Sequence, residues 1–340
     1  MSRYRERMSV NETPCETVAG LGETATLHRI LPRLPQGSDT LLGPGDDAAV
    51  VRAPDGRFVV TTDLMVHGPD FRLAWSTAHD LGWKAAASNL SDVAAMGARP
   101  TALVVALAVP GETAVAFLEE FADGLREGCE AMAPGCGVVG GDLSVSPTMT
   151  IAVTAFGDLE GRESVRRNGA RVGDIVAVSG ALGRSGRGLD LLFRLGVDHR
   201  AEPDATLARA LRERDPDVAW HLAPTPPVAD GVLASVAGAT SMLDLSDGLA
   251  LDAGRVALAS GVVIDLEAAA LGSDPRGALA GGEDHSLFAT FLEGTPLPGG
   301  FRRIGRVRPQ DPAPTVTVDG RPLADATGWD PYSGWSGAQG

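Results

Sequence analysis

Acidic residues recur in this sequence directly after apolar segments and beside glycine or a small polar residue. The pattern occurs at Gly45-Asp46-Asp47, Thr61-Thr62-Asp63, Gly140-Gly141-Asp142 and Asp244-Leu245-Ser246-Asp247-Gly248. A further acid, Asp92, lies inside a segment with helical periodicity. Each aspartate taken singly is a common turn former or helix cap. Because ligands of α/β proteins bind at the ends of strands, the set together predicts one convergent acidic site.

Convergence of several carboxylates has a chemical consequence. The like charges repel one another, so the site needs cations, and hard carboxylate oxygens suit Mg²⁺ held together with substrate phosphates. Gly140, Gly141 and the glycines of residues 180–188 would let backbone N–H groups approach an anion, although turn chemistry explains the second stretch equally well. Arg167 could neutralise phosphate charge, but a solvated linker arginine is the commoner role. The residues therefore predict a metal–phosphate site.

The basic residues exclude other phosphate-binding devices. Lys84 is the single lysine of the chain, and it lies in a helical pattern. A Walker A loop and the strand lysine of a protein kinase are therefore excluded. The net charge of −15 argues against a nucleic-acid partner. The six histidines show no metal-ligand spacing, and the sequence contains no GxSxG elbow.

Length and composition indicate a globular chain of two domains, since 340 residues with 44% hydrophobic content can build two cores. Three cysteines without CxxC spacing favour a reducing cytoplasm. The first residues are polar and predict no signal peptide, and the longest apolar run, residues 102–109, is too short to span a membrane. We expect residues 1–22 to form a loosely packed polar extension.

Hydrophobic periodicity predicts interleaved strands and helices in both halves. In the first half we expect strands at 58–62, 101–109, 136–139 and 149–156, with helices from a cap at Ser76 or Thr77 to Met96 and over 113–132. In the second half we expect strands at 175–178, 242–245, 262–266 and 286–291, with helices at 185–195 and 249–260. The polar stretch 157–173 predicts a joint between a domain of residues 23–157 and one of residues 158–340. The predicted fold class is α/β or α+β, with each half a layered sandwich.

Taken in order, these motifs resemble the thiamine-monophosphate kinase family. The segments that carry the resemblance are Gly45-Asp46-Asp47-Ala48-Ala49-Val50, Thr61-Thr62-Asp63, Asn89 to Gly97, Gly140-Gly141-Asp142, Asp244 to Leu249 and Gly281-Gly282-Glu283-Asp284. The resemblance spans residues 22–335, and GGED together with DxSDGL separates this family from its relatives. It implies the two-domain fold of aminoimidazole ribonucleotide synthetase, a homodimer formed through the N-terminal domains, and phosphoryl transfer from ATP to thiamine monophosphate.

The resemblance also implies roles for individual residues. The implied magnesium ligands are Asp47, Thr62, Asp63, Asp92, Asp142, Asp244 and Asp247. The implied ATP contacts are Gly141, Asp142, Arg167 and Ser246. Glu283 and Trp329 would contact thiamine monophosphate, with Trp335 as the alternative aromatic residue. No side chain is expected to act as a covalent or acid–base catalyst, because metals and positioning would carry the reaction.

Two positions depart from the family pattern. Asp70 stands where the family often has a substrate-contacting histidine, so Asp70 is included among the acceptor residues, with His67 as a nearby substitute. Ala122 stands where some members place an aromatic residue near the nucleotide, which leaves the adenine contact open. Three other functions are compatible with parts of the sequence: another ATP-using synthetase of the superfamily, a magnesium–nucleotide-binding protein without catalysis, and an acidic structural protein.

Overall fold

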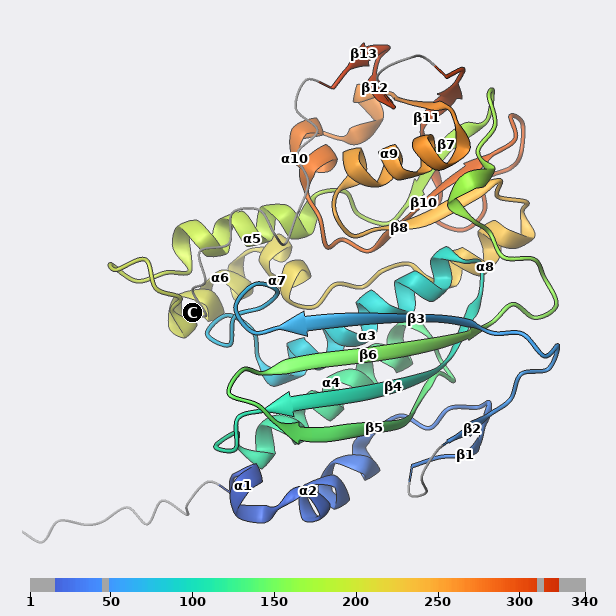
Figure 1. The fold of residues 1–340 in the computed structure, drawn as a ribbon. Helices are drawn as coiled ribbons and strands as arrows, with labels where there is room; N and C mark the ends of the chain where they lie inside the picture. The colour runs from blue at the N-terminus through green and yellow to red at the C-terminus, as the bar shows by residue number, and fades with distance from the viewer. Residues whose placement is uncertain (1–15, 45–48, 311–314, 324–340) are drawn as a thin grey trace, which may run out of the picture.

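The computed structural model describes residues 16–44, 49–310 and 315–323 of the chain (Figure 1). Strands and helices alternate through both halves and build two large sheets, so the predicted mixed α/β class is confirmed. Within the described residues, no helix combines the length and apolar content needed to cross a bilayer.

The first sheet has four strands in the order β3-β6-β4-β5. They are β3 (Val59–Val66), β4 (Arg99–Val109), β5 (Gly137–Val145) and β6 (Thr150–Asp158). Pairing is antiparallel between β3 and β6 and between β6 and β4, and parallel between β4 and β5. Helices α3 (Ala78–Ala95) and α4 (Val115–Met132) cover one face of this sheet (Figure 1).

Helix α3 carries much of the site, and its sequence fixes where it begins and ends. Thr77 and Asp80 form a capping box, which identifies Thr77 rather than Ser76 as the N-cap. Gly97, with φ +74°, ends the helix in the left-handed conformation that favours glycine. Gly82 lets α3 cross α4 closely, since a Cβ there would lie 2.0 Å from the carbonyl oxygen of Phe121.

The second sheet has seven strands in the order β13-β12-β9-β11-β7-β10-β8. Its strands are β7 (Ile175–Ser179), β8 (Ser241–Leu245), β9 (Val263–Leu266), β10 (Ser286–Phe291), β11 (Arg302–Arg308), β12 (Val316–Val318) and β13 (Arg321–Pro322). Helices α8 (Val228–Val236), α9 (Leu249–Ser260) and α10 (Pro275–Ala280) accompany it. Two 3₁₀ turns also belong to this half: Arg167–Gly169 and Ala268–Leu271.

A small helical layer lies beside the joint of the two halves. Helices α5 (Arg184–Leu195), α6 (Ala205–Arg214) and α7 (Pro216–Leu222) pack round Leu192 and Val218. Trp75 of the first half belongs to the same apolar cluster. The two halves are therefore in direct contact at the end of the molecule where α3 meets α7 and β8.

The beginning of the chain differs in part from the predicted loose extension. Thr17 forms a β-bridge with Ala114, and helix α1 (Val18–Leu21) follows it. The backbone N–H of Val18 donates to the carbonyl of Thr113, so residues 16–22 are attached to the first half. Helix α2 (Glu23–Ile30), a 3₁₀ turn (Leu31–Arg33) and the strand pair β1 (Thr40–Leu42) and β2 (Val50–Val51) complete this part.

Candidate active site

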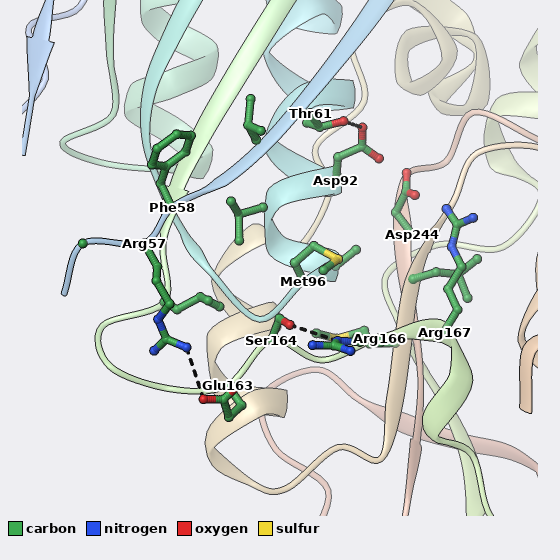
Figure 2. A pocket seen from close by; sticks show the side chains of 17 residues that line it. Arg57, Phe58, Thr61, Asp92, Met96, Glu163, Ser164, Arg166, Arg167 and Asp244 are labelled. Atoms are coloured by element: carbon green, nitrogen blue, oxygen red, sulfur yellow. Dashed lines mark hydrogen bonds and ion pairs between the residues drawn. The ribbon is translucent and has the colours of Figure 1, made fainter. Parts of the chain in front are cut away.

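Three carboxylates from three elements face one another where the two halves meet. Asp63 comes from β3, Asp92 from α3 and Asp244 from β8. Hydroxyl groups of the first half contact them: Thr61 donates to Asp92 over 2.8 Å and Ser91 to Asp244 over 3.2 Å, while Ser88 lies near Asp63 and favours its ionised form. Figure 2 shows Asp92 and Asp244 on opposite sides of the junction. We call these three residues the acid cluster.

Strand β3 shows why neighbouring motif residues do not act together. The prediction that the strand ends at Asp63 is wrong, because β3 continues to Val66. Alternate side chains of a strand point to opposite faces, so Thr61 and Asp63 face the helices whereas Thr62 does not. Thr62 instead donates to the carbonyl of Val153 and accepts from Thr154. Thr61 belongs to the same motif but was given no role from the sequence, and it is the threonine that contacts the acid cluster.

The acid cluster is electrostatically crowded. Burial, together with the charges of Asp244 and Asp63, raises the pKa of Asp92 to about 7. Burial also raises the pKa of Asp63. His285 lies beside the cluster with its Nδ1 3.3 Å from a carboxylate oxygen of Asp244. Burial opposes a charge on His285, but the hydrogen bond and the charge of Asp244 raise its pKa above the ordinary value.

Asp247 lies in the turn after β8, close enough to Asp63 for its charge to add to the crowding. Its carboxylate pairs with the guanidinium of Arg255 at 2.5 Å, and Arg255 also binds the buried Asp252. Ser246 lies in the same turn, where its carbonyl accepts from the N–H of Glu283 at 2.8 Å. The turn is thus tied to the Gly281–Asp284 motif.

Strand β5 holds Gly141 and Asp142 at the far edge of the first sheet. The prediction that this strand ends before them is wrong, because β5 runs to Val145. Two strands separate β5 from β3, which places Asp142 roughly 14 Å from Asp63 at the usual strand spacing. Asp142 is exposed. Gly141 is required by packing, since a Cβ there would lie 1.9 Å from the carbonyl of Val105. One chain therefore does not bring these two residues to the acid cluster.

A groove of about 680 Å³ leads away from the acid cluster (Figure 2). Asp92 and Asp244 line one end, with Arg167 beside them. Phe58 and Met96 supply apolar surface farther along. Arg57 pairs with Glu163 at the edge of the groove. The groove therefore offers acidic, basic and apolar surfaces in one continuous space.

Glu283 lies on the other side of the cluster, in the loop between α10 and β10. Its carboxylate accepts from Lys84 at 3.1 Å and lies 3.4 Å from Nδ1 of His221. Asp70 is close enough for the charges of Glu283, Lys84 and Asp63 to act on it. Burial is the largest cause of the raised pKa of Asp70, while the carboxylate accepts the N–H of Val66 at 2.7 Å. Lys84 and His221 are residues of this region that the sequence argument did not assign.

The remaining predicted residues are not seen at the acid cluster. Asp47, Trp329 and Trp335 lie outside the described residues. Ala122 is completely buried between α4 and the rest of the first core, so it offers no surface to a nucleotide within one chain. The glycines of residues 180–188 serve both turns and packing: Gly180 and Gly183 have positive φ angles, and a Cβ at Gly183 would lie 2.3 Å from the carbonyl of Gly277. A Cβ at Gly188 would lie 2.2 Å from the carbonyl of Asp217.

The donor set fits magnesium, although it is not a closed cage. Among the described residues, which do not include Asp47, no three acidic, histidine or cysteine side chains surround one common metal position. Magnesium usually retains waters and phosphate oxygens and takes only one or two carboxylates, so an open arrangement suits it. A divalent cation would also relieve the repulsion that raises the pKa of Asp92.

Comparison with known proteins identifies the family of this chain. Residues 45–159 match the family model "AIR synthase related protein, N-terminal domain". The thiamine-monophosphate kinase of Mycobacterium tuberculosis is 44% identical, over 95% of this chain and 93% of that protein. The chain belongs to the thiamine-monophosphate kinase family. It is therefore a kinase, an enzyme that transfers a phosphoryl group.

Another relative and two solved structures are also similar to this chain. The thiamine-monophosphate kinase of Corynebacterium glutamicum is 38% identical over 92% of this chain and 94% of that protein. The solved structure of AaThiL complexed with AMPPCP and TMP has a TM-score of 0.68 and 31% identity, covering 91% of this chain and 96% of that one. E. coli HypE, a hydrogenase maturation protein, shares the fold alone, with a TM-score of 0.63 and 19% identity. The predicted fold family is confirmed.

Proposed function

We propose that this enzyme transfers the γ-phosphoryl group of ATP to the phosphate of thiamine monophosphate, giving thiamine diphosphate and ADP. The observation that carries the proposal is the acid cluster, in which half-buried carboxylates of the first half meet the buried Asp244 of the second, with the pKa of Asp92 raised to about 7. Such crowding suits a site built to bind cationic metal and polyphosphate together. The solved relative AaThiL, complexed with AMPPCP and TMP, supports this choice of substrates.

The groove is the proposed nucleotide site. Its acidic end would lie next to the phosphates, where Arg167 could donate to a phosphate oxygen. Phe58 and Met96 would provide apolar contact for the base, which replaces the contact left open at Ala122. Ser246, in the turn after β8, is kept as a further ATP contact.

Asp63, Asp92 and Asp244 would hold the magnesium ions, with Asp47, Thr62, Asp142 and Asp247 as further ligands proposed from the family pattern. Bound magnesium would neutralise phosphate charge and align the reacting groups. At the other end, Asp70 and Glu283, with Trp329, would bind thiamine monophosphate. The carboxylates of Asp70 and Glu283 suit the cationic thiazolium ring of that substrate.

The chemistry needs positioning rather than proton transfer. The acceptor is a phosphate monoester with a second pKa of about 6, so at neutral pH its oxygen is largely ionised and needs no general base. The residues of the site have to hold two anions close and in line, which is the main contribution of enzymes to phosphoryl transfer. We propose direct transfer without a phospho-enzyme. A γ-phosphate made chiral with oxygen isotopes should be transferred with inversion, and retention would contradict the direct step.

A homodimer would complete the site. The face of the first sheet opposite the helices exposes apolar side chains, among them Val60 at 54% and Leu64 at 59%. Asp142 and Thr62 also face away from the helices, at opposite edges of the sheet. We propose that a second copy covers this face and that Asp142 of one chain serves the site of the other.

We also propose that the protein is cytoplasmic, because Cys129 and Cys136 are both free thiols.

Phosphorus NMR of the protein with Mg²⁺, ATP and thiamine monophosphate tests the reaction. We expect thiamine diphosphate and ADP to appear in equal amounts. The Asp63→Asn variant should lose this activity, whereas Asp190→Asn, on the exposed side of α5, should keep it. Binding of ATP without any consumption of thiamine monophosphate would show that the proposed acceptor is wrong.

A further inference from the structure

Lys84 is a chemical exception in this chain. Of the 29 lysine and arginine residues, it is the single lysine. It lies in the middle of α3, and its side chain is only 6% exposed. A lysine is rarely buried unless its ammonium group is paired, so this position calls for an explanation. The ammonium is also compact, which suits a helix packed on most sides, whereas a guanidinium needs room for a planar fork.

Lys84 begins a chain of contacts that runs from the first half to three elements of the second. Its Nζ donates to Oε2 of Glu283 at 3.1 Å. The same oxygen lies 3.4 Å from Nδ1 of His221 on α7, and that nitrogen lies 2.8 Å from Oγ of Ser185 on α5. We call Lys84, Glu283, His221 and Ser185 the Lys84 network. It joins α3 to α5, α7 and the loop that carries Glu283.

The loop that Lys84 holds is strained. Glu283 and His285 both have positive φ angles, +58° and +52°, which non-glycine residues rarely adopt. Such strain persists where surrounding contacts fix the backbone, and it is common at functional sites. His285 of this loop lies 3.3 Å from Asp244, so the part of the loop next to the acid cluster has an anchor of its own, separate from Lys84. The ion pair with Lys84 is one of the contacts that hold this conformation.

The groups of the Lys84 network have defined charges. Burial and the charge of Lys84 hold the pKa of His221 at about 3, so His221 is neutral at physiological pH. Burial alone would raise the pKa of Glu283, but the charge of Lys84 helps to hold it below the ordinary value. The network therefore contains an ammonium, a carboxylate and a neutral imidazole. The carboxylate stays ionised and has a defined orientation.

We propose that Lys84 is a positioning residue for the phosphoryl acceptor, which fixes the Glu283 carboxylate and its loop relative to the acid cluster. This inference rests on the proposed function, in which Glu283 contacts thiamine monophosphate. Lys84 acts through Glu283 and does not itself touch the nucleotide groove. Loss of Lys84 therefore affects acceptor binding and spares ATP binding.

The single lysine allows a direct test. Protein labelled with ¹⁵N-lysine carries one side-chain ammonium, so its Nζ resonance reports on Lys84 without assignment. Thiamine monophosphate should shift this resonance, whereas the non-hydrolysable nucleotide AMPPCP with Mg²⁺ should leave it nearly unchanged. An equal response to both ligands, or none to thiamine monophosphate although calorimetry shows that it binds, would overturn the assignment.

Variants provide the second measurement. Lys84→Met keeps the length of the side chain without its charge, and the matched control is Arg126→Met on the exposed side of α4. Truncating one partner of a buried charge pair is costly, so Lys84→Met should raise KM and Kd for thiamine monophosphate roughly 30-fold or more. KM for ATP should change less than about twofold, because that substrate does not depend on the pair. Arg126→Met should change neither value.

A double-mutant cycle separates positioning from general stability. In the Glu283→Gln background, Lys84→Met should have little further effect on acceptor binding, since coupled residues are not additive. Additive losses, or equal rises of both KM values, would overturn the inference. Lys84→Gln replaces Lys84→Met in the same cycle if circular dichroism shows that the methionine variant does not fold. If the wild type binds no thiamine monophosphate, the proposed function fails; if wild type and Lys84→Met bind it equally, only the inference about Lys84 fails.

Discussion

Replacing Asp92 by asparagine should stabilise the metal-free protein and slow the reaction. Asparagine keeps the shape of the side chain and can still accept the hydrogen bond from Thr61. What it removes is a negative charge that burial and two neighbouring carboxylates disfavour. The same charge is proposed to hold magnesium, so phosphoryl transfer should fall at least ~100-fold, as when other preorganised electrostatic groups are removed.

The magnitude follows from linkage between protonation and folding. The pKa of Asp92 is raised from 3.8 to about 7, so between these values the folded state binds more protons than the unfolded state. Stability therefore falls as the pH rises through this interval, and the full cost, on the order of 4 kcal/mol, applies above pH 7. Because Asp63 and Asp244 share the repulsion, we expect Asp92→Asn to gain roughly 2 to 4 kcal/mol at pH 8 and less than half of that gain at pH 5.

Urea unfolding of chelator-treated protein at pH 8 and pH 5 measures this difference. Asp265→Asn is the control, for which we expect a change of the opposite sign in the free energy of unfolding. Although Asp265 is buried, hydrogen bonds from Thr317, the Gly320 N–H and Arg308 lower its pKa, so its loss should destabilise the protein at pH 8. A less stable Asp92→Asn protein at pH 8, or a gain that stays constant down to pH 5, would refute the electrostatic account of the acid cluster.

Three further predictions test the fold, the interface and the acceptor end. Leu64→Glu, on the exposed face of β3, should convert a dimer to a monomer in light scattering, whereas Leu258→Glu on α9 should not; an unchanged mass for Leu64→Glu would contradict the proposed interface. Gly82→Ala places a Cβ 2.0 Å from the carbonyl of Phe121 and should cost about 3 kcal/mol or more in urea unfolding, whereas Gly140→Ala, which meets nothing within 4 Å, should cost far less. Asp70→Asn can keep the hydrogen bond to Val66 and should raise KM for thiamine monophosphate roughly tenfold without changing KM for ATP. An unchanged KM for thiamine monophosphate would show that Asp70 only stabilises the backbone turn of residues 66–70.

Much of the fold was predictable because local patterns agree with it. The helix from Thr77 to Met96 follows from a capping residue, a run of small apolar residues and a terminal glycine. Strand β10 and helix α9 have the predicted limits. Strands β3 and β5 are longer than predicted, because the polar residues Thr62, Asp63 and Asp142 lie within the strands and do not end them. In a sheet with one face free of helices, such residues remain within the strand.

The residue types proposed for the site follow from sequence alone: several carboxylates, an arginine and glycines that suit phosphate, and no P-loop lysine. The sequence also determined the family, because the ordered motifs are distinctive. Which of the motif residues meet was decided only by the tertiary structure. Strand alternation selects Thr61 rather than Thr62, and sheet order separates Asp142 from Asp63. Burial of Lys84 against Glu283 joins residues 199 positions apart, and no local pattern encodes that distance.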